Sequence, residues 1–266
     1  MSYRVLNMNS IVNYVPLLYL YNSRLRNWRT TLGYLSQEFL PIAITLKLVY
    51  GISLLQTAVA FAGGVVLYEC GYLFNDSASS ACEEGGNRLP ETTISPAYFI
   101  GTRILAFLLL AAAIYAYTDL LSTAKYVTAS VGAAGLLAVH TLQWLRRLPF
   151  IRISTFSALA IYKYPCMVIP SLSWSKTSEI LVACFLSYGL ARVIFYGLRK
   201  YSSVSGPIVE QALGRLQLSF LFLFAPLLLS LGGRAAAMIW FLHLLVLLGL
   251  RALHTSRQLL KRRQQF

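Results

Sequence analysis

The feature that most constrains this chain is a nearly continuous apolar run from about residue 30 to 74. A transmembrane helix needs about 20 residues, so this run is too long to be a single membrane span. Gly51 lies near its middle, and we expect two helices, near 30–50 and 53–74, joined by a tight turn. A chain with such a segment is expected to fold within a membrane.

The rest of the sequence repeats this pattern. Hydrophobic residues make up 57% of the chain and charged residues only 12%, against a usual share of about 25%. The sequence predicts an all-α polytopic membrane protein with about eight transmembrane helices. Residues 1–29 are expected to form an amphipathic segment at the membrane surface, 30–253 the helical bundle and 254–266 a basic cytoplasmic tail. After the first two helices, the further spans are expected near 97–117, 126–145, 154–171, 177–198, 216–232 and 235–253.

The distribution of basic residues predicts the orientation. The chain has 23 Lys and Arg against 9 Asp and Glu. Most of the basic residues lie before the first expected span or after the second, fourth, sixth and eighth spans. Because cytoplasmic loops are enriched in Lys and Arg, eight spans with both termini in the cytoplasm fit best. No soluble basic domain remains outside the apolar runs, which argues against a nucleic-acid-binding protein. On this model the outer side keeps only Lys47, Lys125, Lys176 and Arg234.

Several charged or titratable residues lie inside the expected spans at a similar depth from the cytoplasmic side. A charged side chain in hydrocarbon costs at least about 2.5 to 3.5 kcal/mol, so such residues are expected to face the bundle interior. We expect one polar cavity that opens to the cytoplasm and, being mainly basic, suits an anionic ligand. Alternatively, the charges pair and lock helices together, most plausibly Glu38 with Arg103 or Lys163. The residues of this layer are Glu38, Arg103, His140, Lys163 and Arg192.

Two segments strengthen the case for an anion site. Lys163 precedes Pro165, which removes a backbone hydrogen bond and is expected to kink the fifth helix. Near the end of the sixth helix four residues share one face, where their charges complement the helix C-terminus or, as an alternative, bind phosphate. These four are Arg192, Tyr196, Arg199 and Lys200.

The end of the second helix gathers the acidic residues that the rest of the chain mostly lacks. If the helix continues, its polar residues fall on one face, where carboxylates could hold a divalent cation that in turn holds a diphosphate. The alternative is a solvated helix end that stops at Gly85 and Gly86. The residues of this face are Glu69, Tyr72, Asp76, Ser79 and Glu83.

Within this stretch, Asn75-Asp76, Glu83, Asn87-Arg88 and Pro90 resemble the first aspartate-rich motif of the UbiA superfamily of intramembrane prenyltransferases. The resemblance implies a UbiA-like helical bundle, magnesium held by Asp76 and Glu83 as catalytic ligands, and transfer of an isoprenoid, an alkyl group larger than methyl, from its diphosphate to an acceptor. Besides these two ligands, the expected substrate-binding residues are Glu69, Tyr72, Asn75, Asn87, Arg88, Arg103, Lys163, Arg192, Arg199 and Lys200.

The sequence also departs from that family. Ser79 stands where the middle aspartate is expected, and the loop after the sixth helix has no second aspartate motif. Eight spans are one fewer than the usual nine. Either Arg192, Arg199 and Lys200 replace the second metal cluster, or catalysis has been lost or altered.

We therefore expect a divergent UbiA-like membrane transferase, in a bacterial inner membrane, that acts on a polyprenyl diphosphate or a related lipid phosphate. One alternative is a non-catalytic bundle of the same fold that binds a lipid phosphate or is a partner in lipid-linked glycan assembly or export. A second is a small-solute transporter, suggested by the broken fifth helix. The sequence identifies neither the acceptor nor a protein partner.

Overall fold

The computed structural model describes residues 14–25, 27–82, 95–142, 148–201, 206–230 and 233–263. Regular structure within these ranges is entirely helical, which confirms the expected all-α class. Three predicted site residues, Glu83, Asn87 and Arg88, lie outside the described residues. Arg199 and Lys200 lie within a helix, but their side chains are outside the description.

The described chain starts with a short segment made of α1 (Leu18–Leu20) and the π-helical turn η2 (Tyr21–Leu25). Helical arms follow, and three of them are composite. In chain order the arms are α2 (Trp28–Tyr34) with η3 (Leu35–Phe39) and α3 (Leu40–Tyr50); α4 (Leu54–Cys82); α5 (Pro96–Tyr115); α6 (Leu120–His140); α8 (Pro149–Tyr162) with α9 (Pro165–Val168) and η4 (Ile169–Ser171); α10 (Trp174–Cys184) with η5 (Phe185–Gly189) and α11 (Leu190–Tyr201); α12 (Gly206–Ser230); and α13 (Arg234–Arg263).

Five segments of the described chain are long and apolar enough to cross a membrane, which supports an integral membrane protein. A sixth apolar helix, Arg215–Ser230, is shorter. The expected turn at Gly51 is present: its φ of +71° is the left-handed conformation that glycine adopts readily, and it ends α3. The five segments are Leu54–Asp76, Pro96–Tyr115, Leu120–His140, Trp174–Leu198 and Arg234–Ala252.

Several helix boundaries differ from those expected, and α12 begins at Gly206 and not near 216. The fourth expected helix starts at Leu120 instead of about 126, because the Asp119 side chain accepts the Ser122 backbone N–H and caps the helix there. This backbone hydrogen bond also lowers the pKa of the Asp119 carboxyl. Helix α4 continues to Cys82, eight residues beyond the expected 74, and α13 continues to Arg263.

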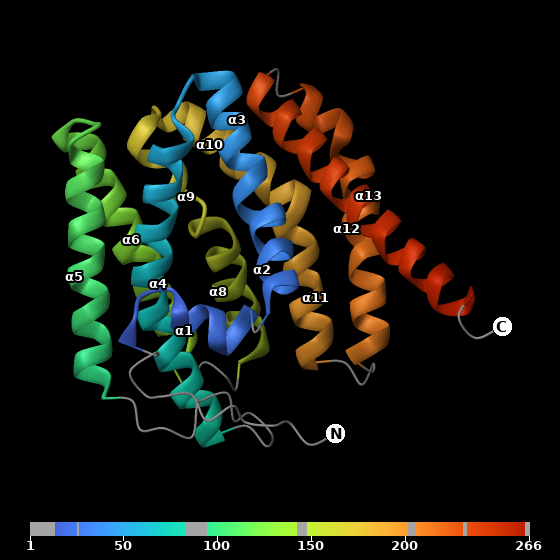
Figure 1. Ribbon diagram of the computed structural model, residues 1–266, viewed down its shortest axis with the longest axis horizontal. Coiled ribbons are helices and arrows are strands. Elements are labelled where there is room, and N and C mark those ends of the chain that lie inside the picture. The colour runs from blue at the N-terminus through green and yellow to red at the C-terminus, as the bar shows by residue number, and fades with distance from the viewer. Residues whose placement is uncertain are drawn as a thin grey trace.

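Neighbouring arms run in opposite directions, and α4 lies between two parts of the bundle (Figure 1). Helices α5 and α6 are on the left of this view and α12 and α13 on the right, with α3, α4, α8 and α9 between them. Close approach of α4 to its neighbours depends on glycine: a Cβ on Gly64 would lie 2.5 Å from Cys166 Cβ, and one on Gly71 would lie 2.6 Å from Leu137 Cδ2. Helix α4 is therefore held in place from both sides.

Candidate functional site

Three interruptions of helical geometry meet around one side chain, Glu38. Glu38 belongs to the π-helical turn η3, and Tyr188 belongs to the π-helical turn η5. Lys163 lies in the break between α8 and α9, two residues before Pro165. Single π-turns within α-helices are rare and are frequent at functional sites, so their convergence here marks the candidate site.

The interruption at η3 has an identifiable cause. Pro41 has no backbone N–H, so it cannot donate to the carbonyl of Gln37, four residues earlier. His243 of α13 lies at this position, with its Nε2 3.1 Å from the Gln37 oxygen. Its ring also stacks on Tyr188, at 5.9 Å between centroids. Helix α13, which is distant in sequence, therefore supports the distorted turn that carries Glu38.

The carboxylate of Glu38 is shared by two cations. Lys163 Nζ lies 2.7 Å from Oε2, and Arg192 Nη1 lies 3.2 Å from Oε1. The Tyr188 hydroxyl donates a 3.3 Å hydrogen bond to Oε1. The predicted pairing of Glu38 with Lys163 is therefore confirmed, whereas Arg103 is not its partner. We call Glu38, Lys163, Tyr188 and Arg192 the Glu38 cluster.

The anion of this cluster is buried, but its cations are accessible. The Glu38 side chain is 2% exposed, whereas those of Lys163 and Arg192 are 24% and 38% exposed. Two positive charges share one negative charge, so these three residues carry a net charge of +1. A ligand that reaches Lys163 and Arg192 therefore meets an excess of positive charge and ready hydrogen-bond donors.

Tyrosines surround the Glu38 cluster. The Arg192 guanidinium lies 4.7 Å from the Tyr188 ring, and Lys163 Nζ lies 5.3 Å from the Tyr164 ring. Tyr164 is 2% exposed, and its hydroxyl has no hydrogen-bond partner among the described residues. Tyr72 of α4 lies near Arg192. Buried polar atoms are normally paired, so the Tyr164 hydroxyl is an unusual buried donor beside this cluster.

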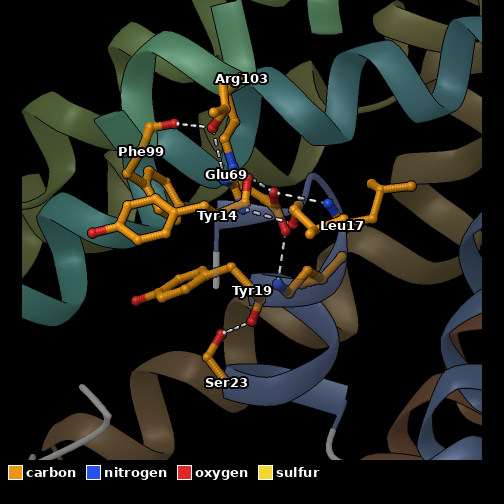
Figure 2. Close-up of polar contacts among 10 residues, drawn as sticks. Tyr14, Leu17, Tyr19, Ser23, Glu69, Phe99 and Arg103 are labelled. Atoms are coloured by element: carbon orange, nitrogen blue, oxygen red, sulfur yellow. Dashed lines mark hydrogen bonds and ion pairs between the residues drawn. The ribbon is translucent and has the colours of Figure 1, made fainter. Parts of the chain in front are cut away.

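The predicted site residues Glu69 and Arg103 form a separate, fully buried pair (Figure 2). Arg103 Nε lies 3.0 Å from Glu69 Oε2. The same carboxylate accepts the backbone N–H groups of Leu17 and Leu20, at 3.0 and 2.7 Å. Arg103 also donates to the carbonyl oxygen of Tyr14, at 2.6 Å. Glu69 and Arg103 therefore fasten residues 14–20 to α4 and α5, and we call this arrangement the Glu69 clamp.

The third acidic residue of interest, Asp76, also contacts the N-terminal segment. Its carboxylate is fully buried and accepts a 2.8 Å hydrogen bond from the Tyr19 hydroxyl. The ring of Tyr19 packs edge-on against Phe99, with centroids 5.0 Å apart. Glu69 and Asp76, seven residues apart on one helix, thus face the same segment, as expected for one continuous helical face.

His140 belongs to a third polar group. Its Nδ1 lies 2.7 Å from Thr155 Oγ1 and its Nε2 lies 3.4 Å from the Tyr196 hydroxyl. The Tyr196 ring stacks on Phe156, with centroids 4.1 Å apart. Of the expected single layer of charges, Arg103 is therefore set apart, because it finds its acidic partner in α4 and not in the first helix. His140 is linked to α11, the helix of Arg192, through Tyr196.

Comparison with protein-family models, with curated proteins and with solved structures finds no match for this chain.

The described residues place few metal ligands together. No group of three or more His, Cys, Asp or Glu side chains within them could hold a metal ion. Asp76 supplies one carboxylate, and its predicted co-ligand Glu83 lies outside these residues. Magnesium is often held by only one or two carboxylates together with substrate phosphates, so Asp76 fits such a site once Tyr19 turns away.

Proposed function

We propose that this protein is a membrane-embedded transferase, divergent from the UbiA type, that acts on a polyprenyl diphosphate or a related lipid phosphate. One observation supports this most strongly: Lys163 and Arg192 converge on Glu38 and remain partly exposed. Two cations held close together suit the oxygens of a phosphate or diphosphate. The resemblance around Asp76 then favours a diphosphate carried by an isoprenoid.

Helix α4 links this cationic site to the acidic residues. Tyr72 lies near Arg192, and Asp76 lies four residues further along the same helix. Residues four apart on a helix are neighbours, at about 5 to 6 Å between Cβ atoms. The diphosphate would thus lie between Lys163 and Arg192 on one side and Asp76 on the other. The backbone of α11 continues to Arg199 and Lys200, which would extend the cationic side towards the cytoplasm.

Magnesium would be held by Asp76 and Glu83, with Asn75, Asn87 and Arg88 close by in sequence. When bound, it would neutralise charge that develops on the leaving diphosphate. Glu69 and Arg103 would act indirectly, because they position the segment that carries Tyr19. Their place in the proposal is therefore structural and differs from the direct substrate contacts that the sequence pattern predicts.

In the proposed reaction, the bond between the allylic carbon and the diphosphate oxygen breaks and its electron pair stays with diphosphate. An acceptor nucleophile forms the new bond to that carbon and loses a proton. Lys163 and Arg192 would stabilise the negative charge on the departing group. Tyr164 could donate its unpaired hydroxyl to an oxygen of the same group.

We further propose that all the helical arms cross the membrane, eight in total, with both termini in the cytoplasm of a bacterial inner membrane. The support is the charge distribution along the sequence. Two of the three composite arms, α2–α3 and α8–α9, carry Glu38 and Lys163, and their interruptions are tolerated where they line a site inside the bundle.

The direct test is binding of farnesyl diphosphate to purified protein in detergent, with and without magnesium. We expect Lys163→Gln to weaken binding at least about tenfold, since charge-assisted hydrogen bonds contribute about 1.5 to 3 kcal/mol. Lys176→Gln is the matched control, because Lys176 also lies 5.3 Å from a tyrosine ring, that of Tyr50, and belongs to the side that we propose to be the outer one. Equal binding by both variants would reject the site.

A second candidate, a lipid-phosphate-binding protein without catalysis, is favoured by one observation. Asp76 is already hydrogen-bonded to Tyr19, so the phosphate site could work without a metal. The same assay separates the two functions. A transferase requires magnesium and loses magnesium-dependent binding in Asp76→Asn, whereas a non-catalytic binder depends on Lys163 and Arg192 alone.

A further inference from the structure

Glu38 occupies the position on Lys163 and Arg192 that an anionic ligand would need. Its two carboxylate oxygens lie 2.7 and 3.2 Å from these cations, much as two phosphate oxygens would. The side chain is buried and is held by the Tyr188 hydroxyl as well. A carboxylate fixed in this way cannot diffuse away, so every incoming anion must compete with it.

This competition depends on the charge of the ligand. A phosphodiester carries one negative charge, the same as Glu38, and would have to weaken both ion pairs of Glu38 to bind. A buried carboxylate that loses its partners is strongly unfavourable. A phosphate monoester or a diphosphate carries two or more charges, so its attraction to the same cations is correspondingly larger. The more highly charged ligand therefore gains more from binding.

This difference matters within a membrane. The surrounding leaflet is rich in phosphodiester headgroups, and basic pockets between transmembrane helices bind such lipids. An open site with two unopposed cations would be filled by them. Rejection of an abundant competitor by a built-in repulsive charge is a general route to specificity.

We propose that Glu38 sets the charge class of the ligand: it competes for Lys163 and Arg192, so that the site accepts phosphate monoesters and diphosphates and rejects phosphodiester headgroups. Glu38 is thus a specificity-determining residue and touches the ligand only through the two cations that it shares. This inference rests on the proposed function, because it concerns the same site.

The test uses two probes with the same tail, dodecyl phosphate and its methyl ester. At about pH 8 the monoester is mainly a dianion, because its second pKa is about 6, and the diester is a monoanion. Binding of both is measured by calorimetry in a non-ionic detergent. We expect wild type to prefer the monoester by at least about tenfold, and Glu38→Gln to bind the diester about tenfold more tightly than wild type does.

Two further variants keep the result interpretable. Tyr188→Phe removes a hydroxyl beside Glu38 but no charge, so it should keep the preference for the monoester. The double variant Glu38→Gln, Lys163→Gln keeps the net charge at +1 through Arg192 but lacks the competing carboxylate. It should bind the diester better than wild type does, and it replaces the single variant if that one does not fold.

The proposal is overturned if wild type binds both probes equally, or if the preference for the monoester persists without Glu38. If binding of the monoester requires Lys163 and Arg192 but the preference for it is the same in wild type and Glu38→Gln, this inference is rejected and the proposed function remains. If wild type binds neither dodecyl phosphate nor farnesyl diphosphate, both this inference and the proposed function are rejected.

Discussion

The Tyr19 hydroxyl donates a 2.8 Å hydrogen bond to Asp76 Oδ2 and so joins the N-terminal segment to α4 across 57 positions of sequence. Both side chains are fully buried. Asp76, the metal ligand of our proposal, is therefore covered by a segment that is itself fastened by the Glu69 clamp. Access to Asp76 and the position of residues 14–25 are thereby coupled.

We expect Tyr19→Phe to increase the apparent affinity for magnesium. The substitution removes the hydroxyl that competes for the Asp76 carboxylate, and a hydrogen bond contributes about 0.5 to 1.5 kcal/mol, equivalent to about twofold to tenfold. The measurement is the magnesium concentration that gives half-maximal binding of farnesyl diphosphate. Tyr21→Phe, an exposed position on the same segment, is the control and should match wild type. An unchanged magnesium requirement in Tyr19→Phe would argue that Asp76 is not a metal ligand.

The sequence predicts well those features that depend on local pattern. The length of the apolar run and Gly51 predict the first turn, because a span has a limited length and glycine adopts positive φ readily. The pairing of Glu38 with Lys163 was one of two expected alternatives, since both residues lie at similar depth in the bundle. The Glu69–Asp76 face follows from helical periodicity alone.

Features that depend on tertiary contacts could not be predicted in this way. Arg103 pairs with Glu69, and both then bind the backbone of residues 14–20, whose return against α4 has no local signal. Tyr188 lies four residues before Arg192 and so on the same helical face, but a tyrosine within an apolar helix is no signal of a site by itself. Pro41 indicates an interrupted helix, but the π-turn that redirects Glu38 depends on support from His243.

The Glu69 clamp predicts strong coupling between its two charged residues. Removal of either partner leaves an unpaired buried charge, so Glu69→Gln or Arg103→Met should each lower the free energy of unfolding by about 3 to 5 kcal/mol. The double variant removes both charges and should be destabilised by clearly less than the sum of the single changes. Thermal unfolding in detergent provides the comparison. Additive effects would contradict a paired clamp.

Loss of the clamp should also free the N-terminal segment. Limited proteolysis is expected to cut near residues 14–25 faster in Glu69→Gln than in wild type, because the carboxylate no longer accepts the Leu17 and Leu20 backbone N–H groups with full charge. Glu179→Gln is a suitable control, since Glu179 accepts a backbone N–H from Ala236 at the start of α13 and does not touch this segment. Equal cleavage rates in the two variants would show that the Glu69 clamp does not hold residues 14–25 in place.

The close packing of α4 predicts different effects of one added methyl group at two glycines. In Gly64→Ala the new Cβ would lie 2.5 Å from Cys166 Cβ, a distance at which α4 and α9 must move apart. Overpacking of this kind typically costs about 1 to 3 kcal/mol. Gly132→Ala in α6 is the matched control, because no atom lies within 4 Å of its new Cβ. Since Cys166 follows Pro165 and Lys163, we expect Gly64→Ala to weaken farnesyl diphosphate binding as well as to lower the melting temperature, while Gly132→Ala leaves both near wild type. Equal melting temperatures for the two variants would mean that α4 and α9 are packed less tightly than the structure indicates.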